Sequence, residues 1–284
     1  MFYQKKIKKL IIEEKKEKSK RSIASVLLDL VLVAAIIVSL LAGKNLYLIY
    51  NEYKAGSDEY AKIQEMVVNE KKAGEEEVYE IKENGKKSWK APIDIDFSQL
   101  IKINPDVVGW IYIEAIPSIN YPITQGEDND YYLHKTYEKQ DNFAGSIFMD
   151  CDNKKDFSDC NTIVYGHNMR NGTMFGSLKK FQDPSTIINS DAIWILTPQG
   201  DYKYQIFSAY NAVINSETYT LFKGPGEQFL NYANSMKSRT ELSTEDYSFE
   251  TKDKILTLST CTGNSNTRYV IQAVRVDPES IIHD

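Results

Sequence analysis

The sequence has little cysteine, little histidine and no excess of positive charge. Its 284 residues include three cysteines and three histidines, and the formal net charge is −6. General nucleic-acid binding normally needs a basic domain, so we expect no nucleic-acid partner. Three cysteines allow at most one disulfide and leave one thiol over. The chain also lacks internal repeats and low-complexity tracts, and its 42% of hydrophobic residues is typical of a globular protein.

One long apolar run stands near the N-terminus, "SIASVLLDLVLVAAIIVSLLAG", residues 22–43. It has about the twenty residues that a helix needs to cross a bilayer core. A signal peptide is an alternative, but its apolar region would be shorter and no clear cleavage site follows. A buried helix is another, but this run has no polar face. The sequence therefore predicts a transmembrane helix over residues 23–43.

The charges on either side of this run predict its orientation. Residues 1–22 are rich in lysine, whereas lysines are scattered after Gly43. Because positively charged flanks stay on the cytoplasmic side, we expect a cytoplasmic tail over residues 1–22. The prediction is a single-pass protein of the cell membrane whose remaining chain is extracytoplasmic.

Two further regions follow. Residues 44–90 are charged, contain no proline and carry apolar residues at helical spacing, which predicts a helical stalk or cap. Residues 91–284 predict the compact domain. They contain short runs rich in Val, Ile, Tyr and Thr, separated by turn residues, as in a β-barrel or sandwich. One segment differs, because Gly224–Leu242 has apolar residues at helical spacing and predicts an inserted helix.

Cys261 ends the strand-like run "KILTLSTC". Alternation along a strand places it on one face with Thr257 and Ser259, a more polar face than that of the leucines between them. Arg268 opens the next run, so pairing of the two strands would bring its guanidinium near the thiol. A cation favours the reactive thiolate and suits an oxyanion. The alternatives are a buried structural cysteine and an arginine in a surface salt bridge.

The other histidines and cysteines give weaker signals. His167 ends the run "NTIVYGH", where a site residue could lie, although it could equally be structural. His134 is interpreted as a surface residue and His283 as part of the C-terminal tail. Cys151 and Cys160 flank a polar loop and could form a disulfide or both be free.

Together, "TLSTC", the closely following Arg268 and the upstream "YGH" resemble the sortase family of cell-wall transpeptidases. The resemblance runs from about Phe97 to Val276. Within the family the sequence most resembles class B. Three features carry this likeness: the N-terminal helical extension, the stretch "NKKDFSDCNTIVYGHNM" and the helix in Gly224–Leu242. It implies a mainly β fold: a closed barrel of about eight strands, with N-terminal helices and an inserted helix before the cysteine strand.

The resemblance also implies residue roles. Cys261 would be the nucleophile, His167 the general acid and base, and Arg268 the group that stabilises the oxyanion or holds the substrate. Four residues match, or loosely match, substrate-groove positions: Ser259, Tyr165, Asn129 and Leu133. We expect no cofactor and no required metal, since the acidic residues between Asp150 and Asp159 lack convincing calcium spacing.

The activity implied is transpeptidation. The enzyme would cleave a C-terminal sorting motif of exported proteins through a thioacyl intermediate. It would then transfer them to an amine of peptidoglycan, in a lipid-linked precursor or the nascent wall. Two alternatives stay open: an exported thiol protease that uses water as acceptor, and a membrane-anchored binding module in which Cys261 is structural.

Overall fold

The computed structural model describes residues 2–17, 23–70, 79–81, 87–240, 242 and 247–278. The chain divides into two compact units, Met1–Tyr53 and Lys54–Asp284. The first contains helix α1 (Phe2–Glu17) and most of the apolar part of helix α2 (Ile23–Val67). The predicted helix over residues 23–43 is confirmed as part of α2. Its apolar window has a mean hydropathy of 2.8 and is unburied, so α2 is long and apolar enough to cross a membrane.

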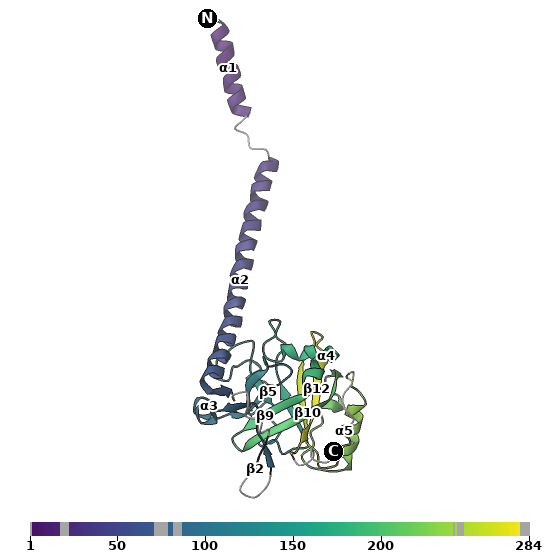
Figure 1. The fold of residues 1–284 in the computed structure, drawn as a ribbon. Coiled ribbons are helices and arrows are strands. Elements are labelled where there is room, and N and C mark those ends of the chain that lie inside the picture. The colour runs from purple at the N-terminus through teal and green to yellow at the C-terminus, as the bar shows by residue number, and fades with distance from the viewer. Residues whose placement is uncertain are drawn as a thin grey trace. The chain divides into compact units, whose positions relative to one another are not determined.

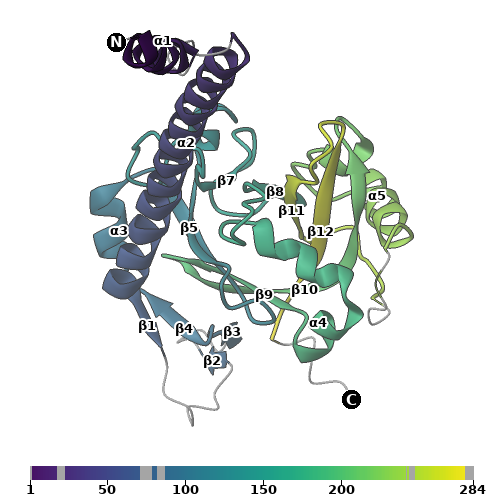
Figure 2. The same ribbon diagram turned by 90° about the horizontal axis from the view of Figure 1, so that it is seen from above.

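A closed eight-stranded β-barrel forms the second unit within the part of the chain that the structure describes (Figures 1 and 2). The strands follow the order β12-β11-β8-β7-β6-β5-β9-β10, and β10 pairs with β12 to close the ring. The pairs β6–β7 and β8–β11 are parallel. The strands are β5 (Val107–Ile113), β6 (Asn120–Thr124), β7 (Ile147–Met149), β8 (Asn161–Tyr165), β9 (Ala192–Thr197), β10 (Gly200–Val213), β11 (Ile255–Cys261) and β12 (Thr267–Val276). The predicted barrel is confirmed.

Short helices connect these strands. They are α3 (Phe97–Ile103), α4 (Pro184–Asn189), α5 (Glu227–Lys237) and the 3₁₀ turns η1 (Tyr131–Leu133), η2 (Gly176–Gln182) and η3 (Glu217–Tyr219). Helix α3 begins where the Asp96 carboxylate accepts hydrogen bonds from the backbone N–H groups of Ser98 and Gln99. It ends at Ile103, two residues before Pro105, because proline disfavours helical geometry in the residue before it.

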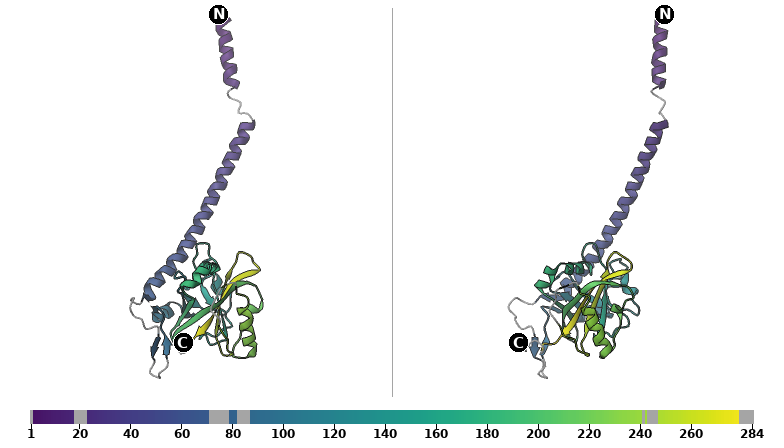
Figure 3. Two further views of the ribbon diagram at one scale, coloured as in Figure 1. Left: turned by 45° about the vertical axis from the view of Figure 1, so that its right-hand side comes forward. Right: turned by 90° about the vertical axis from the view of Figure 1, so that its right-hand side faces the viewer.

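Helix α5 lies between β10 and β11 in the chain and packs outside the barrel (Figure 3). Its apolar face, predicted from helical spacing, is buried: Phe229, Tyr232, Ala233 and Met236. These side chains contact residues of β10 and β12, among them Phe207, Val270 and Val274. The predicted inserted helix is therefore confirmed, and it covers one end of the sheet face that carries Cys261.

The structure differs from the predicted helical stalk between residues 68 and 89. Helix α2 ends at Val67, and three strands follow in the described residues: β1 (Val68–Glu70), β2 (Tyr79–Ile81) and β3 (Lys87–Trp89). Strand β1 pairs with β4 (Ile93–Ile95), while β2 and β3 form a hairpin beside β10. The predicted helix over residues 44–90 therefore ends at Val67, and the described residues beyond it pair as strands.

The last turns of α2 belong with the barrel. Tyr60, Ile63 and Val67 lie on one helix face and are buried. The Tyr60 hydroxyl donates to the Gly145 carbonyl at 2.8 Å. The compact unit that contains the barrel thus begins at Lys54, and the division of the chain near residue 91 stays a prediction.

Candidate active site

The register of three adjacent strands places Cys261 beside the other predicted site residues. Cys261 is the last residue of β11 and pairs directly with Arg268 of β12. On the other side, Ser259 pairs with Tyr165 of the parallel strand β8. Paired residues on neighbouring strands share a face, and residues two apart on one strand share it too. His167, two residues beyond Tyr165, therefore extends the same face level with Cys261.

All seven predicted site residues line one open cavity of about 280 Å³. Its floor comes from β7, β8, β11 and β12, and one wall comes from the segment around η1. The lining residues are Asn129, Leu133, Phe148, Tyr165, Gly166, His167, Ser259, Thr260, Cys261 and Arg268. The structure thus brings together residues that lie up to 139 positions apart (268 − 129) in the sequence.

The His167 ring is held at one nitrogen. Nε2 lies 2.8 Å from the Leu133 carbonyl oxygen, which can only accept, so Nε2 carries the proton in this arrangement. In the neutral ring the lone pair is then on Nδ1. Burial lowers the pKa of His167 below its usual value, the Leu133 hydrogen bond opposes that shift, and nearby His134 lowers it further. The resting ring is therefore neutral at neutral pH.

Arg268 is oriented by its own hairpin. Its Nη1 donates to the carbonyls of Ser265 and Thr267 at 3.1 and 2.9 Å. Among the residues that the structure describes, no carboxylate lies within ion-pair distance of its guanidinium. The surface salt bridge considered as an alternative is thus not formed there, and the remaining donors can serve an anion in the cavity.

Two side chains that were not predicted hold the Cys261 strand in place. Asn168 Nδ2 donates to the Cys261 carbonyl at 2.6 Å, which ties the segment after His167 to the end of β11. The Tyr219 hydroxyl lies 3.0 Å from Ser259 Oγ. Asn168 could have been found from its place directly after "YGH", whereas nothing in the sequence singles out Tyr219.

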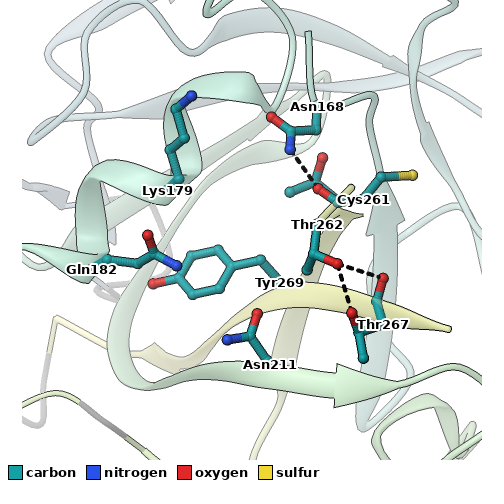
Figure 4. Close-up of a pocket in the computed structure, with 9 residues that line it drawn as sticks. Asn168, Lys179, Gln182, Asn211, Cys261, Thr262, Thr267 and Tyr269 are labelled. Atoms are coloured by element: carbon teal, nitrogen blue, oxygen red, sulfur yellow. Dashed lines mark hydrogen bonds between the residues drawn. The ribbon is translucent and has the colours of Figure 1, made fainter. Parts of the chain in front are cut away.

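A second, more polar cavity of about 480 Å³ lies on the other side of the Cys261 backbone (Figure 4). Lys179, Gln182 and Tyr269 line it. Figure 4 shows the Cys261 sulfur pointing away from these side chains. The thiol is therefore presented to the first cavity, with His167 and Arg268.

The other two cysteines are free rather than paired with each other. Cys160 is fully buried in the cluster under α5, where its sulfur accepts a hydrogen bond from Lys254 Nζ at 3.5 Å. Burial and the neighbouring carboxylates of Asp150 and Asp152 raise the pKa of the Cys151 thiol, which disfavours its nucleophilic form.

The structure locates the remaining residues that the sequence analysis considered. Ligand atoms of Asp150, Cys151 and Asp152 lie within 4.8 Å of one another, but both Asp150 oxygens already accept hydrogen bonds. The absence of a required metal stays a prediction. His134 is exposed, as predicted, yet its ring centroid lies 6.4 Å from that of His167. His283 is outside the described residues.

Fold and cavity together define a β-barrel protein with a cysteine, a histidine and an arginine gathered at one strand end. The family model of the sortase domain matches residues 111–276. Sortase B of Listeria monocytogenes is 36% identical over 166 residues, which are 58% of this chain and 67% of that protein. The chain therefore belongs to the sortase family of cysteine transpeptidases, and it is most like class B.

Solved structures agree with this assignment. Sortase B from B. anthracis in complex with AAEK1 is similar with a TM-score of 0.65 and 30% identity, covering 80% of this chain and 99% of that one. Clostridium perfringens sortase B has a TM-score of 0.60 and 32% identity, covering 64% of this chain and 100% of its own. A Staphylococcus aureus sortase B–substrate complex is also similar, with a TM-score of 0.59 and 32% identity, covering 64% and 85% of the two chains.

Proposed function

We propose that this protein cleaves a C-terminal sorting motif of exported proteins and joins them to an amine of peptidoglycan. It would do so outside the cell, held in the cell membrane by α2 with its N-terminus in the cytoplasm. The observation that carries the proposal is the single cavity shared by Cys261, His167 and Arg268. The lysine-rich segment before α2 supports the orientation.

The first half-reaction forms a thioester. Cys261 Sγ attacks the carbonyl carbon of the scissile peptide bond, while its proton passes to His167. The carbonyl oxygen becomes an oxyanion, which the Arg268 guanidinium stabilises. The C–N bond then breaks, and His167 gives the proton to the leaving amine.

The second half-reaction reverses these roles. An incoming amine attacks the thioester carbon and loses a proton to His167. The C–S bond breaks and the Cys261 sulfur leaves as a thiolate, which takes that proton from His167 and so restores the neutral ring. Asn129, Leu133, Tyr165 and Ser259 would hold the sorting motif along the cavity, since all four line it.

A ligation assay tests the proposal and its alternatives. The enzyme is mixed with a sorting-signal peptide, with and without an amine acceptor such as a glycine peptide, and products are separated by mass spectrometry. We expect an amine-ligated product. Its rate of formation should fall by about a thousandfold or more in Cys261→Ala. Arg268→Ala should lower the rate about a hundredfold.

The alternatives predict other products. Hydrolysed peptide alone, even at high amine concentration, would indicate a thiol protease. Turnover that survives in Cys261→Ala would contradict both enzymatic functions. Cys160→Ala serves as a control, because that buried thiol lies outside the cavity.

A further inference from the structure

A buried carboxylate lies directly behind the predicted peptide groove. Asp150 follows strand β7 and is 6% exposed. Its Oδ2 accepts from the Tyr165 hydroxyl at 2.9 Å and from Asn129 Nδ2 at 3.0 Å. Its Oδ1 accepts from the backbone N–H of Asp152 at 3.0 Å. Burying a carboxylate is costly unless donors replace water, and here three donors do so.

Two of these bonds constrain residues of the cavity lining, Tyr165 and Asn129. A phenol has one proton to donate. Tyr165 donates it to Asp150, so only the lone pairs of its oxygen face the groove. The carboxamide of Asn129 is held at both ends, because its Oδ1 also accepts from the backbone N–H of Cys151 at 2.8 Å. Asn129 is otherwise an exposed loop residue, free to choose other rotamers.

We propose that Asp150 is a positioning residue for substrate recognition. It fixes the Asn129 wall and makes the Tyr165 oxygen a hydrogen-bond acceptor for a backbone N–H of the bound peptide. Asp150 does not line the cavity itself, so it acts through these two side chains. Only the identity of the peptide rests on the proposed function; the hydrogen-bonded arrangement does not.

An amide cannot replace this carboxylate. In Asp150→Asn one acceptor oxygen becomes an NH₂ donor. If the NH₂ faces Asp152, two N–H groups oppose each other and that turn is disturbed. If it faces Asn129, the two NH₂ groups oppose each other and Tyr165 is released to turn its proton into the groove. The first orientation loses the one bond that Oδ1 accepts, and the second loses both bonds that Oδ2 accepts.

Kinetics with sorting-signal peptide test the consequence for recognition. We expect Asp150→Asn to lower kcat/KM about tenfold, the effect of one hydrogen bond, mainly through KM. In a Tyr165→Phe/Asn129→Ala background the same substitution should cost less than twofold, because coupled residues are not additive. Equal losses in both backgrounds, or no loss in either, would overturn the proposal. Asp152→Asn is the matched control, because its side chain is exposed and its backbone N–H is kept.

A titration tests the arrangement without any turnover. Besides burial, the Asp150 charge and hydrogen bond raise the pKa of Tyr165, and Tyr219 and Cys151 add to this. With 3-fluorotyrosine at position 165, followed by ¹⁹F NMR, Asp150→Asn should lower the phenol pKa, while Asp152→Asn should not. An unchanged pKa refutes the positioning role. A lowered pKa in a protein that never processes peptide supports it and refutes the proposed function instead.

The variant must fold for this comparison, which thermal unfolding checks. If Asp150→Asn does not fold, the titration of the unsubstituted protein still tests the proposal. Its fluorotyrosine pKa must lie above that of the free amino acid, and an equal or lower value contradicts a phenol bonded to a buried carboxylate. Asp150→Glu, which keeps both acceptor oxygens, should retain more peptide affinity than Asp150→Ala.

Discussion

At the scale of single residues, the state of His167 decides how the proposed chemistry begins. The ring is half-buried, and its Nε2 proton is directed at the Leu133 carbonyl. Burial disfavours imidazolium, so the lowered pKa keeps the ring neutral at neutral pH. A neutral ring can accept a proton from the thiol as it attacks. In the proposed mechanism the neutral ring would act first as the base and then, once protonated, as the acid.

This leads to a pH prediction. An NMR titration should give His167 a midpoint below its usual 6.5. His134→Gln should raise it, since the neighbouring imidazolium contributes to the depression. A midpoint above 6.5, or one that does not respond to His134, would contradict the described surroundings of the ring.

The same shift links His167 to stability. Well above pH 6.5 neither the folded nor the unfolded ring is protonated, so no effect arises. As pH falls below that value, the unfolded state binds a proton more readily than the folded state, and the free energy of unfolding falls. Urea denaturation at several pH values should show this slope reduced in His167→Gln.

At the scale of elements, the end of β8 depends on a residue with no side chain. A Cβ at Gly166 would lie 2.5 Å from Ile147 Cδ1 and 2.7 Å from the Phe175 ring. We expect Gly166→Ala to cost about 1–3 kcal/mol, the usual range for overpacking. It should also slow peptide cleavage, because Tyr165 and His167 flank it. Gly224→Ala is the control, because no heavy atom lies within 4 Å of its Cβ position. Equal stability of the two variants would contradict this packing.

The sequence predicted some elements well and others badly, for physical reasons. Helix α5 and strands β11 and β12 have clear apolar periodicity. Their type and their order along the chain could therefore be predicted from the sequence. Strands β2 and β3 lie in a charged segment with little periodicity, and β10, the partner of β3, is over a hundred residues away. Local pattern could not reveal that pairing.

The residues of the candidate site also differ in how well the sequence predicted them. Cys261 and Arg268 were predictable as neighbours, since a short hairpin connects their strands. Asn129 and Leu133 rested on a loose resemblance, yet both line the cavity. Asp150, Asn168 and Tyr219 were missed as site residues, because their contacts exist only once the barrel closes.

At the scale of the whole molecule, the last turns of α2 pack against the barrel through buried side chains. Ile63 is fully buried, whereas Met66, one turn along, is 39% exposed. Ile63→Ala should therefore lower the free energy of unfolding by about 2–5 kcal/mol, and Met66→Ala should change it little. Chemical denaturation of the two variants measures the difference. A small effect at Ile63 would contradict the packing described for the last turns of α2.

The central claim is that the Cys261 sulfur carries the acyl group between two substrates. Intact-mass spectrometry of the enzyme with sorting-signal peptide, quenched in acid without an amine, tests it most directly. The account predicts a mass gain equal to the N-terminal part of the cleaved peptide, localised to Cys261 and removed when an amine is added. Cleavage without any adduct, or an adduct on another residue, would contradict it.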